Sequence, residues 1–183
     1  AINGEGFATP YWGIAFSLGA GVAAGTNALV SQRYGAAAYD ELGQAIRSSA
    51  LLLIVITIPI AVLFASAPEA LVGVLTDTRA EIDYGARYLQ ILALGVPFAA
   101  LNLIGSRALI GADDAWIPMV LRGGGAISNI LLNAVFIFGL GMGVAGAAWG
   151  SVLANVFVTG SLAVGLARGG LPGVGAFPVQ VDP

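Results

Sequence analysis

The sequence contains no cysteine, no histidine and no lysine. Without cysteine the chain has neither a disulfide framework nor a thiolate metal ligand. Without histidine it lacks the usual zinc and haem ligand and the commonest general base. All seven basic residues are arginines, and they are scattered along the chain. A surface for nucleic acid needs clustered basic residues, so we expect no nucleic-acid partner.

Charge is also scarce. Charged residues make up 9% of the 183 residues and hydrophobic residues 58%, whereas a soluble domain has about 25% charged residues. The mean hydropathy of +0.91 agrees with this imbalance. The apolar segments contain no Asp or Glu, and no nucleophile beside a base or phosphate-binding loop is visible. We therefore predict a membrane protein that is not an enzyme and that needs no cofactor.

Five apolar segments are each long enough to cross a bilayer, which takes about 20 residues. The sequence thus predicts an all-α integral membrane protein, a polytopic bundle of about five transmembrane helices within residues 1–168. Residues 169–183 are rich in glycine and proline and predict a linker toward a further segment. We expect residues upstream of Ala1 to be missing as well. The predicted helices cover residues 6–31, 48–68, 84–106, 115–138 and 144–167.

The arginines predict the orientation of these helices. With five crossings, most arginines fall on one side of the membrane, and arginine is enriched on the cytoplasmic side. We therefore expect Ala1 outside, the linker inside, and a multi-pass location in the cell membrane. The first side holds Arg33, Arg47, Arg107, Arg122 and Arg168, and the other side holds only Arg79 and Arg87.

The last two predicted helices form a hairpin around the glycines at 139, 141 and 143, and they carry the polar residues of interest. Asn129 and Asn133 are four residues apart and lie on one helix face, and Ser151 on the next helix can reach their level. Polar groups at this depth avoid lipid and face protein or a water-filled cavity. Their oxygens suit a hard cation or a polar substrate. The alternative is that they only join the helices by hydrogen bonds.

Arg122 is the one charged residue between residues 115 and 167. It lies about two turns into its helix, near the membrane surface. We interpret it as structural: its side chain extends to the interface or pairs with Asp113 or Asp114.

Several motifs in order resemble those of the multidrug and toxic compound extrusion (MATE) transporters. They are GTNALVSQRYGA at residues 25–36, YLQI at 88–91 followed by Pro97, RALIGADD at 107–114 followed by Pro118, NILLN at 129–133 and GMGVAGAA at 141–148. No single motif is specific, but their order and spacing cover nearly the whole chain up to Arg168.

The resemblance implies helices two to six of a six-helix lobe, with the first helix and a second lobe missing. Such transporters export amphipathic, often cationic compounds in exchange for Na+ or H+. In archaeal-type members the cation site of this lobe maps to Asn129, Asn133 and Ser151. Those members have an aspartate at the position of Asn133, so this sequence departs from their pattern there.

Two other functions stay open at this point. A lipid-linked oligosaccharide flippase of the same superfamily needs arginines in its cavity, and Arg122 is the only candidate. A non-transporting membrane scaffold would act through helix packing alone. For a transporter we expect the lipid bilayer and a small amphipathic molecule as partners.

Overall fold

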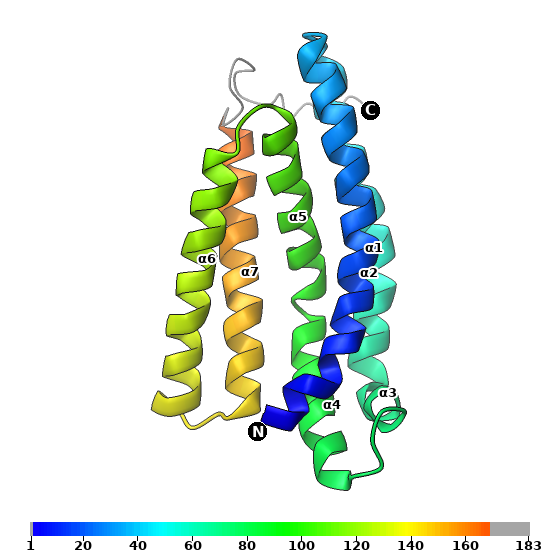
Figure 1. Cartoon of the computed structure of the whole chain (residues 1–183), viewed down its shortest axis with the longest axis vertical. Helices are drawn as coiled ribbons and strands as arrows, with labels where there is room; N and C mark the ends of the chain where they lie inside the picture. Colours follow the sequence, from blue (N-terminus) through cyan, green and yellow to red (C-terminus); the bar gives the residue numbers. More distant parts are fainter. Residues whose placement is uncertain (1, 169–183) are drawn as a thin grey trace.

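The computed structural model describes residues 2–168, except for the side chains of residues 2–5, 7 and 8. The described part is a bundle of long helices without strands (Figure 1). The predicted linker at 169–183 lies outside the described residues. The elements are α1 (Ile2–Gly35), α2 (Tyr39–Ser66), α3 (Pro68–Gly73), α4 (Arg79–Ala93), α5 (Val96–Gly111), α6 (Trp116–Ala134), the π-helical turn η1 (Val135–Gly139) and α7 (Val144–Ala167).

Four of the described helical segments are long and apolar enough to cross a membrane, and α4 with α5 forms a fifth candidate that is bent by 50°. The chain is therefore an all-α membrane protein with the predicted number of crossings when the bent pair counts as one.

The third predicted helix, at residues 84–106, is instead two helices. Pro97 has no N–H to donate to the carbonyl of Ala93, so the regular hydrogen-bond ladder cannot continue through this point. The chain tightens there: the N–H of Gly95 donates to the carbonyl of Leu92 at 2.8 Å. The proline thus explains the bend between α4 and α5.

The connection predicted at residues 33–47 is much shorter in the structure, because α1 runs to Gly35 and α2 begins at Tyr39. The charged residues continue the helices beyond the apolar segments instead of forming a loop. Arg33 pairs with Glu41 across the turn at 3.3 Å, and the rings of Tyr34 and Tyr39 meet edge to face at 6.1 Å. Apolarity marks where a helix lies in lipid, but it does not mark where the helix ends.

The core lies between α1, α2, α5 and α7 toward one end, and between α1, α2, α4 and α7 toward the other. Leu53, Leu89 and Ile104 are among its fully buried side chains. By contrast, α6 buries only Pro118 and Gly125, and it packs mainly on α7 at the edge of the bundle (Figure 1). This arrangement leaves space between the α6–α7 hairpin and helices α1 and α4.

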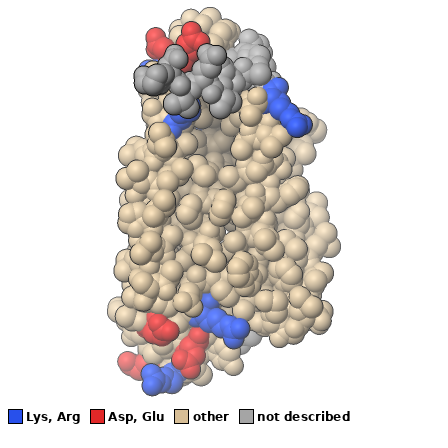
Figure 2. Space-filling model, turned by 180° about the vertical axis from the view of Figure 1, so that it is seen from behind, with Lys and Arg blue, Asp and Glu red and all other residues tan. Residues whose placement is uncertain are grey.

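Charged side chains gather at the two ends of the molecule, and the face between them is uncharged (Figure 2). The end with the α1–α2 turn and the α5–α6 connection carries five arginines, and the end with α3 carries Arg79 and Arg87. The structure therefore brings together the arginines that the sequence assigned to the cytoplasmic side.

Cysteine labelling tests this orientation, because the chain has no cysteine of its own. Asp40 and Asp77 are positioned at opposite ends, in the α1–α2 turn region and in the α3–α4 connection. In the full-length protein in intact cells, with any other cysteines replaced, we expect a membrane-impermeant maleimide to label Asp77→Cys. Asp40→Cys should react only after the cells are permeabilised, since arginine-rich ends stay in the cytoplasm. The reverse pattern would contradict the assignment.

Candidate functional site

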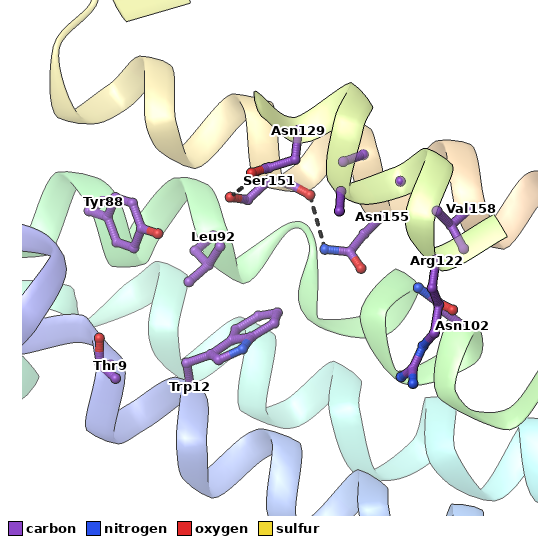
Figure 3. Close-up of a pocket in the computed structure, with 13 residues that line it drawn as sticks. Thr9, Trp12, Tyr88, Leu92, Asn102, Arg122, Asn129, Ser151, Asn155 and Val158 are labelled. Carbon is purple, nitrogen blue, oxygen red and sulfur yellow. Dashed lines mark hydrogen bonds between the residues drawn. The ribbon is translucent and has the colours of Figure 1, made fainter. Parts of the chain in front are cut away.

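A cavity of about 490 Å³ opens between the α6–α7 hairpin and helices α1, α4 and α5 (Figure 3). Its wall mixes aromatic and aliphatic side chains with amides, hydroxyls and one guanidinium, and ligand sites typically combine an apolar wall with a few polar groups. The lining residues are Thr9 and Trp12 on α1, Tyr88 and Leu92 on α4, Asn102 on α5, Arg122, Gly125, Ala126 and Asn129 on α6, and Ser151, Ala154, Asn155 and Val158 on α7.

Helix α6 presents two different faces. Arg122, Gly125 and Asn129 recur at intervals of three and four residues, so they lie on one face, and all three line the cavity. The opposite face exposes Ile127 and Leu131, each 61% accessible. Because apolar side chains suit lipid and polar ones do not, this pattern explains why the polar face of α6 turns toward α7 and the cavity.

The three residues that the sequence singled out form one hydrogen-bonded chain. The Nδ2 amide of Asn133 donates to Oδ1 of Asn129 at 3.1 Å, and Nδ2 of Asn129 donates to the Ser151 hydroxyl at 3.2 Å. The Ser151 hydroxyl in turn donates to the carbonyl of Ala147 at 3.1 Å. The hydrogen bonds that Asn129 accepts from Asn133 and donates to Ser151 therefore hold its carboxamide at the cavity wall.

Asn133 lies behind this wall and does not line the cavity. It packs against Gly150 so closely that a Cβ at that glycine would come within 2.0 Å of Oδ1 of Asn133. This oxygen is buried and has no hydrogen-bond partner among the described residues. Asn133 therefore orients Asn129 rather than facing the cavity directly, while Asn129 and Ser151 do line it.

Other polar residues of the hairpin serve helix packing. The hydroxyl of Thr159 donates to the carbonyl of Phe98 on α5 at 2.7 Å, which joins α7 to α5. The hydroxyl of Ser161 donates within its own helix to the carbonyl of Phe157 at 2.9 Å. The sequence left two roles open for the polar residues of the hairpin, lining a cavity and joining helices by hydrogen bonds, and the structure contains examples of both.

Sequence reasoning missed Asn102, Asn155 and Trp12 as cavity residues. Asn102 could have been found, since it is an amide within an apolar segment like Asn129. Asn155 lies one turn after Ser151 and donates to the Ser151 carbonyl at 2.9 Å. Trp12 gave no signal, because an aromatic residue in a membrane helix faces lipid as readily as protein.

One of the two expectations for Arg122, an ion pair with an aspartate, is not met. Arg122 makes no ion pair with Asp113 or Asp114 in the described structure, and it lines the cavity (Figure 3). Oδ1 of Asp114 instead accepts from the backbone N–H groups of Trp116 and Ile117 at 3.0 and 3.1 Å, which caps α6. The helix cap therefore occupies the carboxylate that was expected to pair with the arginine.

Carboxylates are missing from the cavity wall as described, and the described side chains form no cluster of three acidic residues that could bind a metal ion. The oxygen ligands on offer are therefore neutral amides and hydroxyls. Such groups orient a polar ligand, but they compensate a buried positive charge less well than a carboxylate does.

Comparisons with known proteins agree on one family. The family model described as MatE matches residues 1–135. The DNA damage-inducible protein F of Escherichia coli (strain K12) is 30% identical over 130 residues, which cover 71% of this chain and 28% of that protein. The multidrug and toxin extrusion protein 1 of Danio rerio is 28% identical over 148 residues, covering 81% of this chain and 24% of that protein.

A solved structure, a crystal structure of MATE in the bent conformation, superimposes with a TM-score of 0.84 at 26% identity. The match covers 90% of this chain and 37% of the solved chain. The chain therefore spans between about a quarter and two fifths of the length of these three proteins.

Proposed function

The chain belongs to the MatE family, and on that premise we propose that it is part of a transporter that exports amphipathic drugs or metabolites across the cell membrane. The observation that carries the proposal is the cavity between the α6–α7 hairpin and α1 and α4. It has an aromatic and aliphatic wall for the apolar part of a substrate. It also has fixed amide and hydroxyl groups, at Asn129 and Ser151, for a polar part.

Transport in this proposal works by alternating access between two lobes. Substrate sites of secondary transporters lie at the interface between repeats, and one lobe rocks against the other around the site. The described helices supply one wall of such a site. The first helix and the second lobe that the family resemblance implies would supply the remainder, and the lipid bilayer and the small molecule are the partners.

The coupling ion is Na+ or H+ in this proposal, as the family resemblance implies. No described residue at the cavity is a carboxylate, and Asn133 stands where the resemblance to archaeal-type members implies an aspartate. An amide cannot take up a proton at physiological pH, and it gives a cation less compensation than a carboxylate. We therefore place the ion-coupling group in another part of the full-length protein.

Export by the full-length protein in liposomes tests the role of the cavity. Asn129→Leu removes the central member of the hydrogen-bonded chain and leaves the amide of Asn133 unpaired. A substrate also loses the amide of Asn129 as a hydrogen-bond partner, which is worth about 0.5–1.5 kcal/mol of binding, so we expect export of a fluorescent amphipathic dye at low concentration to fall by up to about tenfold.

Two serines on α7 provide a matched comparison. Ser151→Ala removes the acceptor of Asn129, whereas Ser161→Ala removes only a bond within its own helix. We expect export to fall in Ser151→Ala and to stay unchanged in Ser161→Ala. Full export in Asn129→Leu, Asn133→Leu and Ser151→Ala would count against a cavity role and would favour a scaffold that acts through packing.

Arg122 favours a second candidate, a flippase for lipid-linked oligosaccharides, because the guanidinium lines the cavity and can bind a pyrophosphate. Binding of lipid-linked sugars and of cationic and anionic amphipathic dyes to the purified full-length protein separates the two. Tight binding of the sugar lipid with no binding of either dye would favour the flippase.

A further inference from the structure

Arg122 lies on the same face of α6 as Asn129, seven residues and therefore about 10 Å along the helix from it. Its side chain is exposed, and Figure 3 shows it at the opposite end of the cavity from Thr9 and Tyr88. The exposed surface of this guanidinium thus belongs to the cavity wall and not to the lipid-facing side of α6.

Arg122 has no protein partner among the side chains that the structure describes. The described residues make neither an ion pair nor a hydrogen bond with it. The wall of the cavity, so far as it is described, offers no carboxylate, and the nearby carboxylate of Asp114 caps α6. Because Arg122 lines the cavity without a counter-charge among the described residues, its N–H donors are available to an anionic ligand there.

Asn102 on α5 lies at the same end of the cavity in Figure 3. Its Oδ1 accepts a hydrogen bond from the hydroxyl of Ser106 at 3.3 Å, which leaves the Nδ2 group pointing away from that bond. None of the described residues accepts from Nδ2 of Asn102. This end of the cavity therefore combines one guanidinium and one free amide donor.

A guanidinium beside an amide N–H donor favours an anionic ligand over a cationic one. A guanidinium binds carboxylate and phosphate groups through two parallel hydrogen bonds, and it repels a cation. The rest of the wall includes Trp12, Leu92 and Val158, which suit an apolar body. The chemistry of the wall thus fits a molecule with an anionic group at one end and an apolar remainder.

We propose that Arg122 and Asn102 bind the carboxylate or phosphate group of an amphipathic anion, whose apolar part lies in the same cavity. This inference rests on the proposed function, because it names the substrate class of the same site. It makes the cavity selective for anions, although the family resemblance implied mainly cationic compounds.

The test uses the purified full-length protein and two probes that share a fluorophore. Dansylglycine carries a carboxylate, and dansyl-ethylenediamine carries an ammonium group. We expect the wild type to bind dansylglycine more tightly. Arg122→Gln should weaken dansylglycine binding by about tenfold or more, since a hydrogen bond to a charged group is lost. Binding of the cationic probe should stay equal or become tighter. Arg122→Lys keeps the charge but not the paired hydrogen bonds, and it should fall between the two.

Arg107→Gln is the matched control. Arg107 is an exposed arginine on α5 that does not line the cavity. Its removal should change neither affinity. Displacement of dansylglycine by dodecyl phosphate, but not by inorganic phosphate, would identify a lipid-like anion, and displacement by both would identify a free anion. An equal loss of both probes in Arg122→Gln, unchanged binding, or a preference for the cationic probe in the wild type would overturn the proposal.

Export assays distinguish a failure of the anion-site proposal from a failure of the proposed transport function. If dansylglycine binds in an Arg122-dependent manner but is not exported, the anion site stands and the transport proposal fails. If Asn129→Leu abolishes export while Arg122→Gln leaves dansylglycine binding unchanged, transport through the cavity stands and the anion site is wrong.

Discussion

Replacing Gly125 by leucine is expected to reduce export by the full-length protein to the background of protein-free liposomes. Gly125 is buried in the cavity wall between Arg122 and Asn129, where α6 packs against α7. A Cβ at this position would lie 2.4 Å from Cγ2 of Val158. The larger side chain must therefore enter the cavity, where it fills the space for a substrate, or push the two helices apart, which displaces the polar face of α6 that lines the cavity.

A second substitution separates these outcomes. Val158→Ala shortens the side chain that the new residue meets, so Gly125→Leu with Val158→Ala should recover much of the thermal stability in detergent while the cavity stays filled. Gly123→Leu is the control, because Gly123 is exposed and a Cβ added there would have no atom within 4 Å. Normal export by a stably folded Gly125→Leu variant would show that substrates do not pass this cavity.

Gly150→Ala is expected to destabilise the protein by about 1–3 kcal/mol, the usual cost of an overpacked site. The added methyl would lie 2.0 Å from Oδ1 and 3.2 Å from the backbone nitrogen of Asn133. Since the asparagine must move, its hydrogen bond to Asn129 is lost too. Thermal unfolding of the full-length protein in detergent measures the first effect, and export from liposomes the second.

Gly160→Ala provides the comparison on the same helix. Gly160 is exposed and a Cβ there meets no atom within 4 Å, so the unfolding temperature should stay equal or rise, since alanine favours a helix by about 1 kcal/mol over glycine. Gly150→Ala combined with Asn133→Ala removes the clash with the amide and should regain stability but not export. A Gly150→Ala variant that unfolds at the wild-type temperature would contradict the close contact between α6 and α7.

Part of the site was predictable, because local spacing decided it. Asn129 and Asn133 are four residues apart, so they had to share a helix face, and the glycine-rich turn fixed which part of α7 returns beside them. Ser151 could therefore be placed at their level from the sequence alone. The position of Asn133 behind the wall was not predictable, since it depends on how closely Gly150 lets α7 approach.

The position of Arg122 in the cavity wall could not be predicted from the sequence. Near a helix end, an arginine can reach the membrane surface, an aspartate or the interior, and the local sequence permits all three. Which one occurs depends on the rotation of α6 about its axis and on Asp114 capping that helix. The three-dimensional packing of five separate helices brings Arg122, Asn102 and Trp12 to one cavity.

The sequence by itself determined the membrane location, the number of apolar segments, the arginine-rich end and the polar hairpin, because hydropathy and helical periodicity are properties of neighbouring residues. Only the tertiary structure decided which faces of α6 and α7 meet, the position of Asn133 behind the wall, and the cavity that Arg122 lines without a partner among the described residues. These features depend on contacts between residues far apart in the chain, and a linear pattern does not specify which faces of two helices meet.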